Sequence, residues 1–358
     1  MAPRPPPAEL MDELVEEILL RIPPDDPTRL LRAALVCKRW CRIVSAAGFR
    51  LRFREFHRTP PILGFLHDHR LSYTLVSTTS SFRPPPAACP NSYRATDARH
   101  GRVLLSRHRC YRNTLAIAFV VWDPIRGQST ELPLLPSSDT WNAAVLCAAV
   151  GACDHLDCQH GPEFLVVFVG TGNGNGNGGT FAHVYSSEAA AWSKRISAQH
   201  LHEDIRSLPS ALAGNALYFV CSTIILKYDL AAREMSVIHL PGECFFRPIV
   251  VRTTEDGGLG LASIRSHRLY LHEWSIEDAG WVQSKVIKLT KLLPDETLGS
   301  LRLTGFAHGL DIILVVASER TFTIDLKSLQ VTKVCEEGWC YGIFPYMSFC
   351  NPGSRVRL

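Results

Sequence analysis

The sequence has no long apolar run, and its charges nearly balance. Its longest apolar segments, such as FLVVFVG and IILVVA, are of strand length and fall far short of the ~20 residues that a membrane helix needs. The formal charge of +4 over 358 residues comes without a long run of lysine and arginine. These absences argue against a membrane protein and against nucleic-acid binding through a basic patch.

The first ten residues, MAPRPPPAEL, lack the apolar core of a signal peptide. We therefore expect the twelve cysteines to be reduced thiols, and we expect the protein in the cytoplasm, the nucleus or both. The catalytic signatures G-x-S-x-G and H-E-x-x-H and the P-loop are also missing from the sequence. We expect a protein that is not an enzyme and has no cofactor.

Residues 10–22 predict an amphipathic helix with a wide apolar face. On a helical wheel the apolar side chains fill an arc of roughly 180°, opposite a face of acids, whereas docking on one core needs a stripe of little more than about 100°. This face is wide enough to cover two surfaces. The apolar positions are Leu10, Met11, Leu14, Val15, Ile18, Leu19 and Ile22.

A second helical region follows two prolines that end the first helix. Asp26 suits the N-cap and Pro27 the first helical position, and the apolar residues from Leu30 to Val44 predict one or two short helices. A unit of about forty residues is near the lower limit for a stable core, yet this one has surplus apolar side chains. Either the rest of the chain covers the surplus, or a groove on another protein does, with Trp40 as a buried anchor.

The segment LMDELVEEILLRIPPDDPTRLLRAALVCKRWCRIV resembles an F-box, the module by which substrate receptors attach to the Skp-type adaptor of cullin ubiquitin ligases. An opening leucine, an Ile-Leu pair, an Ile-Pro step and a Val-Cys motif ending in Trp occur in order. Met11 departs from the family's usual proline, and the connection before the Val-Cys motif is slightly long. The resemblance implies that seven residues lie at or just behind the adaptor contact: Leu10, Ile18, Leu19, Pro23, Val36, Cys37 and Trp40.

The remaining three hundred residues change to short apolar runs separated by Gly, Pro, Asn, Asp and Ser. Five segments align on an aromatic or aliphatic residue followed by Asp or Ser, whose side chain can fix a turn by accepting backbone N–H groups. The copies are roughly 63, 43, 46 and 50 residues apart, as expected for propeller blades. The aligned pairs are Trp122-Asp123, Tyr185-Ser186, Tyr228-Asp229, Trp274-Ser275 and Ile324-Asp325.

Seven positions after the aligned residue come Trp192 and Trp281 in two copies, with Met235 and Val331 in two others, and we interpret the aromatic residues as packing between blades. Glycine pairs before two copies resemble degenerate kelch-type blades, and the FPYM segment near the end resembles the terminal segment of plant F-box propellers. We expect five or six blades, with WCYGIFPYMSFC closing the ring by completing the first. A pair of β-sandwiches is the structural alternative.

Two segments contain residues typical of a metal site or a dinucleotide site, but their patterns favour loops. CDHLDCQH contains zinc's preferred ligand types at Cys153, His155, Cys158 and His160, yet a tetrahedral site usually draws on two short pairs separated by a longer loop. GTGNGNGNGG has the form of a dinucleotide fingerprint, which must open a helix, whereas the following TFAHVYSS alternates like a strand. Scattered histidines, including His100, His183 and His267, could meet a Ser or Asp only in three dimensions.

These observations predict an α+β multidomain protein. A small three-helix F-box over residues 8–55 precedes a linker over 56–98, which can include first-blade strands, and a kelch-like all-β propeller over 99–350. By resemblance it would be a substrate receptor of a Skp–cullin–F-box ubiquitin ligase, bound to a Skp-type adaptor and through it to cullin, with an unknown protein target and no nucleic-acid or membrane partner. The alternative is a ligand- or metal-binding propeller with the helices as a structural cap.

Overall fold

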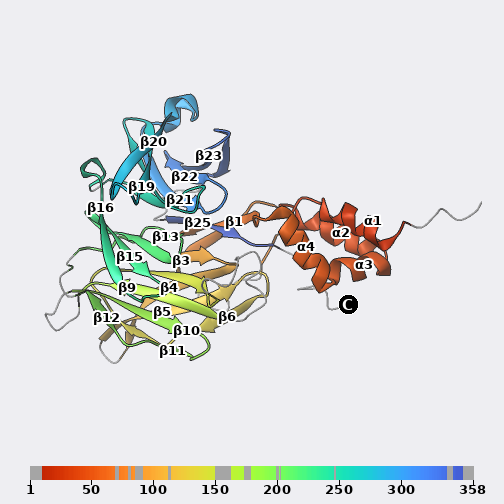
Figure 1. The fold of residues 1–358 in the computed structure, drawn as a ribbon, viewed down its shortest axis with the longest axis horizontal. Helices are drawn as coiled ribbons and strands as arrows, with labels where there is room; N and C mark the ends of the chain where they lie inside the picture. The colour runs from red at the N-terminus through yellow and green to blue at the C-terminus, as the bar shows by residue number, and fades with distance from the viewer. Residues whose placement is uncertain are drawn as a thin grey trace, which may run out of the picture.

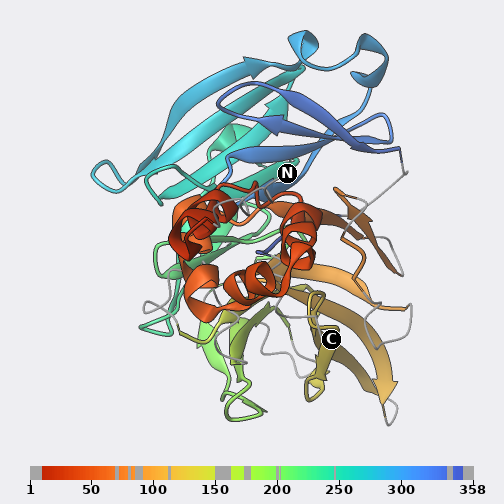
Figure 2. The same cartoon turned by 90° about the vertical axis from the view of Figure 1, so that its right-hand side faces the viewer.

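The computed structural model describes residues 10–68, 72–79, 82–84, 92–111, 114–149, 163–172, 179–198, 201, 203–245, 247–336 and 342–349. The chain forms a helical part at one side of a six-bladed β-propeller (Figure 1). Seen from the side of the helices, the blades fan out above and below them (Figure 2). No helix among these residues is both long and apolar enough to cross a membrane.

The helical module, as we call residues 10–57, contains four helices where three were predicted. Asp26 caps the second helix as expected, because its carboxylate accepts a hydrogen bond from the Thr28 backbone N–H at 3.1 Å and Pro27 is the first helical residue. The chain turns between the second and third helices at Cys37, which has an extended backbone. The helices are α1 (Asp12–Leu20), α2 (Pro27–Val36), α3 (Lys38–Ser45) and α4 (Ala47–His57).

The fourth helix corrects the expectation of a three-helix module. Phe49 and Phe53 of α4 lie four residues apart and therefore on one helical face, and both are buried in the core of the module. This spacing was visible in the segment GFRLRFREFH, most of which lay within the predicted F-box over 8–55, but no helix was predicted there. The core of the module joins all four helices around Val15, Leu19, Leu20, Leu30, Ala33, Ala34, Val44, Phe49 and Phe53.

The propeller has six sheets of antiparallel strands, within the predicted range of five or six. Blade 1 is β2 (Tyr73–Ser77), β1 (Ile62–Asp68) and β25 (Gly342–Met347), and blade 2 is β3 (Arg94–Arg99), β4 (Arg102–Tyr111), β5 (Thr114–Asp123) and β6 (Gln128–Glu131), with β7 (Leu135–Pro136) beside β5. Blade 3 is β8 (Trp141–Cys147), β9 (Phe164–Gly170), β10 (Thr180–Ser186) and β11 (Ala191–Trp192), with β12 (Ile196–Ala198) beside β10.

Three further blades complete the ring. Blade 4 is β13 (Ala211–Ala213), β14 (Ala216–Val220), β15 (Ile224–Asp229) and β16 (Met235–His239); blade 5 is β17 (Ile249–Thr253), β18 (Leu259–Arg265), β19 (Arg268–Ser275) and β20 (Gly280–Lys288); blade 6 is β21 (Leu301–Ala307), β22 (Ile312–Ala317), β23 (Arg320–Asp325) and β24 (Val331–Cys335). Short 3-10 turns follow at η2 (Gly242–Cys244), η3 (Leu289–Lys291) and η4 (Asp295–Thr297).

The C-terminal strand closes the ring as predicted. β25, which contains the FPYM segment, pairs with β1 from the start of the propeller and contacts β3 and β21 of the neighbouring blades. An apolar cluster fills each space between adjacent blades, from Trp122 between blades 1 and 2 to Leu314 between blades 6 and 1. This arrangement is a propeller and not the alternative pair of β-sandwiches.

The repeated Asp or Ser forms the turn that was predicted for it. In blade 6 the Asp325 carboxylate accepts hydrogen bonds from the backbone N–H groups of Lys327 at 2.9 Å and Ser328 at 2.7 Å. Asp123 and Asp229 do the same in blades 2 and 4, and a serine hydroxyl replaces the carboxylate in blades 3 and 5. Each turn ends four residues later at a positive φ, at Gly127, Ala190, Arg233, Ala279 and Leu329.

The seven-residue spacing has a direct structural cause. Tyr185 lies opposite Trp192 and Trp274 opposite Trp281 across the third and fourth strands of their blades. The indole N–H groups of Trp192 and Trp281 donate to backbone carbonyls of the preceding blade. Trp192 donates to Pro133 and Trp281 to His239, both at 2.8 Å. These tryptophans therefore connect neighbouring blades, as interpreted from the sequence.

Candidate functional site

The helical module exposes an apolar surface, which we call the docking face. Helix α1 divides its apolar side chains between the core, where Val15 and Leu19 are buried, and solvent, where Ile18 is 54% exposed. The wide apolar arc of this helix thus covers only one surface within the chain. The docking face consists of Leu10, Met11, Leu14, Ile18, Leu35 and Val36, which are 47–72% exposed.

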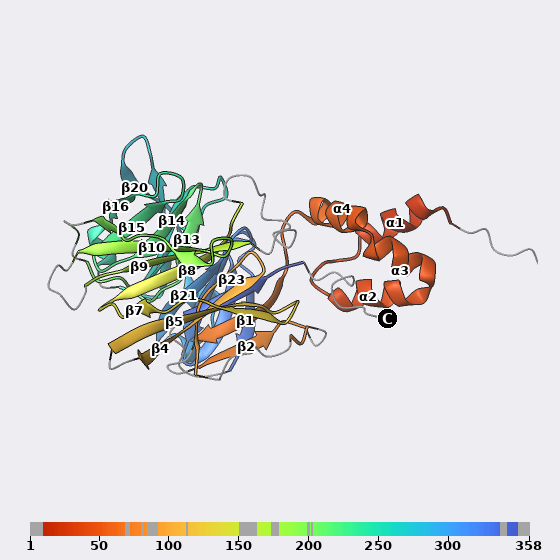
Figure 3. The same ribbon diagram turned by 90° about the horizontal axis from the view of Figure 1, so that it is seen from below.

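Arg39 joins the two segments that form the docking face. Its guanidinium donates hydrogen bonds to the carboxylate of Asp12 and to the backbone carbonyl of Leu10, although Arg39 itself lies in the first turn of α3. The start of α1 is thereby held beside the turn that follows Val36. In two perpendicular views α1 and α3 lie on the side of the module away from the propeller (Figures 1 and 3), so the propeller does not cover them.

Charged side chains of α1 form ion pairs. Glu17 pairs with Arg21 at 2.7 Å one turn later on α1, and Arg52 of α4 pairs with Glu16. Both pairs keep at least one partner in solvent, where an ion pair adds about 1 kcal/mol or less to stability.

The seven residues that the sequence predicted as adaptor contacts fall into three groups. Leu10, Ile18 and Val36 belong to the docking face, Cys37 is exposed directly after Val36, and Pro23 is exposed after α1. Trp40 is partly buried against the core of the module. Leu19 is 1% exposed and therefore lies behind the face.

Three exposed members of the face were not among the predicted contacts: Met11, Leu14 and Leu35. They had been identified as apolar helical positions, but the family pattern did not single them out. For Met11 and Leu14 the signal was the width of the apolar arc on the first helix, which does not tell which part of the arc faces inward. Leu35 lies on α2, outside that arc.

The centre of the propeller contains buried charge. The carboxylate of Asp97 on β3 lies 3.6 Å from the guanidinium of Arg99, and both side chains are less than 10% exposed. Burial raises the pKa of Asp97 although Arg99 and the Val145 backbone N–H act against the shift, and burial lowers the pKa of Arg99. Arg99 also donates to the backbone carbonyl and the hydroxyl of Ser210 at the start of blade 4, so it links blades across the ring.

His308 extends this central group from blade 6. Its Nδ1 lies 3.0 Å from the hydroxyl of Thr253, which donates to the Leu212 carbonyl at 2.8 Å. Burial, with the nearby charge of Arg99, lowers the pKa of His308 to about 3. A histidine with so low a pKa is a weak base at neutral pH, so this Thr–His contact lacks the poised base that an activated nucleophile needs.

The three scattered histidines named from the sequence lie in the propeller, and two of them have hydrogen-bond partners on the backbone. His100 Nδ1 accepts a hydrogen bond from the Cys147 backbone N–H at 3.1 Å, His183 Nδ1 contacts the Ser193 carbonyl at 3.0 Å, and His267 lies in the turn between β18 and β19. No cluster of three or more possible metal ligands occurs among the described residues. Cys153, His155, Cys158 and His160 lie outside them.

The glycine-rich segment joins two strands, because β9 ends at Gly170 and β10 begins at Thr180. The strand after the glycines is confirmed, so the helix that a dinucleotide site requires does not follow them.

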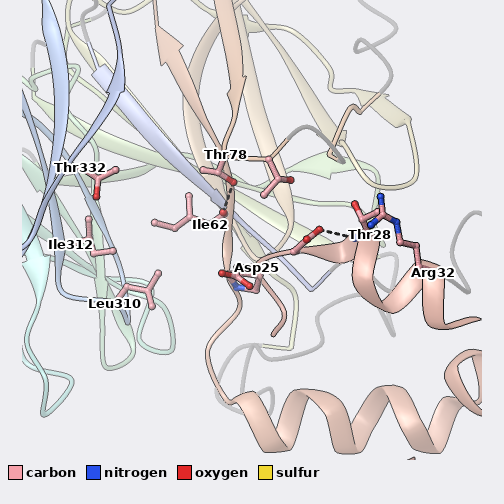
Figure 4. A pocket seen from close by; sticks show the side chains of 11 residues that line it. Asp25, Thr28, Arg32, Ile62, Thr78, Leu310, Ile312 and Thr332 are labelled. Carbon is pink, nitrogen blue, oxygen red and sulfur yellow. Dashed lines mark hydrogen bonds between the residues drawn. The ribbon is translucent and has the colours of Figure 1, made fainter. Parts of the chain in front are cut away.

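An open cleft of about 1010 Å³ lies between the helical module and the propeller (Figure 4). Asp25, Thr28 and Arg32 line its helical side. Blades 1 and 6 provide the other side, which includes partly exposed apolar residues such as Ile62 and Ile312. The helices and the blades are thus not packed flush at this place.

Comparisons with known proteins agree with the two parts of the structure. A family model for the F-box domain matches residues 9–52, and the model described as "F-box protein AT5G49610-like, beta-propeller" matches residues 94–353, well over half of the chain. No curated protein matches the chain in sequence.

Several solved structures match the chain at low identity. They include a protein from Lactobacillus plantarum (11% identity, TM-score 0.44, 77% of this chain and 82% of that chain), a functionally unknown protein from Desulfotomaculum acetoxidans (9%, 0.46, 80% and 99%) and dipeptidyl peptidase 4 from Porphyromonas gingivalis (10%, 0.34, 77% and 52%). The two family models, together with the helical module and the six-bladed ring, show that the chain belongs to the F-box proteins with an AT5G49610-like β-propeller.

Proposed function

We propose that this protein is the substrate-recognition subunit of a Skp–cullin–F-box ubiquitin ligase. The observation that carries the proposal is the docking face of the helical module, the exposed apolar side chains of α1 and of the end of α2. Helix α1 lies on the side of the module away from the propeller (Figure 3). The F-box family match supplies the partner that would cover this face, a Skp-type adaptor, and cullin would join through that adaptor.

Leaving the docking face in water has a free-energy cost. Fully burying a Leu, Ile or Met side chain gains ~1.5–3 kcal/mol, and this face holds six large apolar side chains that remain largely exposed. Part of that gain is offset by the entropy lost on association, but an amphipathic helix in a partner's groove is a recurrent mode of stable binding. Trp40, half-buried behind the face, would be held in place by the same contact.

The propeller would hold the target. Its six blades form a stiff ring whose connecting loops can present a binding surface. In this proposal the protein performs no chemistry; it raises the rate of ubiquitin transfer by holding the target near a charged conjugating enzyme. We further propose that it acts in the cytoplasm, the nucleus or both.

Binding to the adaptor can be tested with two substitutions in the docking face. The full chain and the double variant Ile18→Asp/Val36→Asp are each co-expressed with a Skp-type adaptor, and the complex is purified and its Kd measured by calorimetry. We expect loss of affinity of ~100-fold or more in the double variant, because two carboxylates would be buried without partners. Folding should be unchanged, since both side chains are exposed.

The matched control is Ile276→Asp, which places the same charge at a position 88% exposed on blade 5. It should leave the adaptor Kd unchanged. Equal binding by the full chain and the double variant, or no binding by a folded full chain, would contradict the proposed function.

A further inference from the structure

Two chain segments cross side by side between the helical module and the propeller. The first, residues 58–61, leads from α4 to β1; the second, Ser348 and Phe349, leaves β25 in the opposite direction. A hydrogen bond from the Ser348 backbone N–H to the Pro61 carbonyl, 3.3 Å long, joins them. The C-terminal strand of the propeller therefore continues toward the helices.

Phe349 lies inside the helical module. Its side chain is 3% exposed, and it belongs to the apolar cluster built from α1, α2, α3 and α4. Its ring packs edge-on against Phe53 of α4, with centroids 6.3 Å apart and ring planes at 80°. The module thus takes one residue of its core from the end of the chain, nearly 300 positions beyond its last helix.

The strand that carries Phe349 is firmly built into the ring. The hydroxyl of Tyr346 donates to the Gly101 carbonyl of blade 2 at 3.2 Å, and its ring stacks on Phe82 with centroids 5.6 Å apart. Ile343 is fully buried between blades 6 and 1. Any movement of Phe349 would be resisted by these contacts, because only Ser348 separates it from β25.

An open cleft lies beside these two crossing segments, so a buried contact between the helical module and the propeller would limit their relative motion. Blades 1 and 6 face the α1–α2 connection and the start of α2 across an open volume of about 1010 Å³ (Figure 4). Two domains whose facing surfaces are not packed over a large apolar area are expected to move relative to each other. The buried contact of Phe349 opposes that motion.

We propose that Phe349 is a positioning residue that fixes the orientation of the helical module relative to the propeller. The orientation itself is a property of the chain alone. Its consequence, that the docking face and the target-binding ring are held at a constant angle, rests on the proposed function.

The orientation can be measured as a distance distribution in the full chain. Spin labels attached to p-acetylphenylalanine at Glu13 of α1 and at Ile276 of blade 5, both exposed, avoid the twelve cysteines. Pulsed electron resonance should give a narrow distribution for the native sequence. We expect Phe349→Ala to widen it at least twofold and Phe349→Leu, which retains an apolar filling, to widen it far less.

The matched control is Phe219→Ala, which removes an equally buried phenylalanine from blade 4, outside the crossing. It should lower stability without widening the distribution. An unchanged width in folded Phe349→Ala, or equal widening in Phe219→Ala, would overturn the proposal. If Phe349→Ala does not fold, Phe349→Val takes its place, and an unchanged width there overturns the proposal as well.

A second measurement separates this proposal from the proposed function. Phe349 lies behind the docking face, so the adaptor Kd of Phe349→Leu should stay within twofold of the native value. If the adaptor binds neither protein, the proposed function fails while the distance result still decides the role of Phe349.

Discussion

The helical module and the propeller use the same kinds of apolar side chains in different ways. Eight of the fifteen large apolar side chains that are exposed among the described residues lie within residues 10–57. In the propeller, by contrast, apolar clusters fill the spaces between all adjacent blades. Exposed apolar side chains are therefore concentrated in the helical module, where a partner is expected. The apolar side chains of the propeller are mostly buried between its own blades.

The largest effect should come from the core of the ring. Trp122 is 1% exposed between blades 1 and 2, so Trp122→Ala should cost ~3–5 kcal/mol of stability in denaturant titrations. Measured well below the unfolding transition, the adaptor Kd should not change. A parallel loss of adaptor affinity in folded protein would show that the two regions do not act separately.

Two leucines of α1 test the comparison within a single helix. Leu19 is 1% exposed, and Leu19→Ala should lose ~2–5 kcal/mol of stability. Leu14 is 47% exposed, and Leu14→Asp should leave the unfolding midpoint almost unchanged while weakening adaptor binding at least tenfold. Thermal unfolding and calorimetry of both variants would decide, and an exchange of the two outcomes would refute the assignment of the docking face.

The centre of the ring should make stability depend on pH. The pKa of His308 falls from 6.5 to about 3 on folding, so between these values the unfolded chain binds more protons than the folded one. Stability from this group is complete above pH 6.5 and is lost as the pH falls toward 3, at up to ~1.4 kcal/mol per pH unit.

The measurement compares stability as a function of pH in the native protein and in His308→Asn, whose side chain cannot titrate. Asp97, whose pKa is raised by burial, contributes with the opposite sign, but it is present in both proteins. The difference between the two stability curves across this pH range should therefore isolate His308. Parallel curves would mean that His308 is not buried in its neutral form.

The smallest effect concerns one repeated turn. Asp325→Ala removes the acceptor of two backbone N–H groups and should cost ~1–2 kcal/mol at neutral pH. These backbone donors, Ser328 first, hold the pKa of Asp325 below its ordinary value of 3.8. The contribution is therefore present above pH 3.8 and lost as the pH falls through the lower folded pKa. Ser275→Ala, in the equivalent turn of blade 5, should cost less because its acceptor is uncharged.

Much of this fold could be predicted because its signals are local. In blades 2 to 6 the Asp or Ser accepts hydrogen bonds from backbone N–H groups two or three positions ahead. The seven-residue spacing follows from a tight turn between two paired strands. Closure of the ring by the last strand could also be predicted, because the FPYM segment is similar to a known terminal segment. The fourth helix was missed although Phe49 and Phe53 have helical spacing, because the F-box over 8–55 was expected to contain three helices.

Local patterns in the sequence were enough to predict the helical module, the wide apolar arc on α1 and the repeated turns, since each depends on residues close together in the chain. Long-range packing places Leu14 in solvent and Leu19 in the core, brings Arg99 to Ser210, and puts Phe349 into the helical core. These contacts join residues separated by tens to hundreds of positions, and no local period or propensity records which distant surface a side chain will meet.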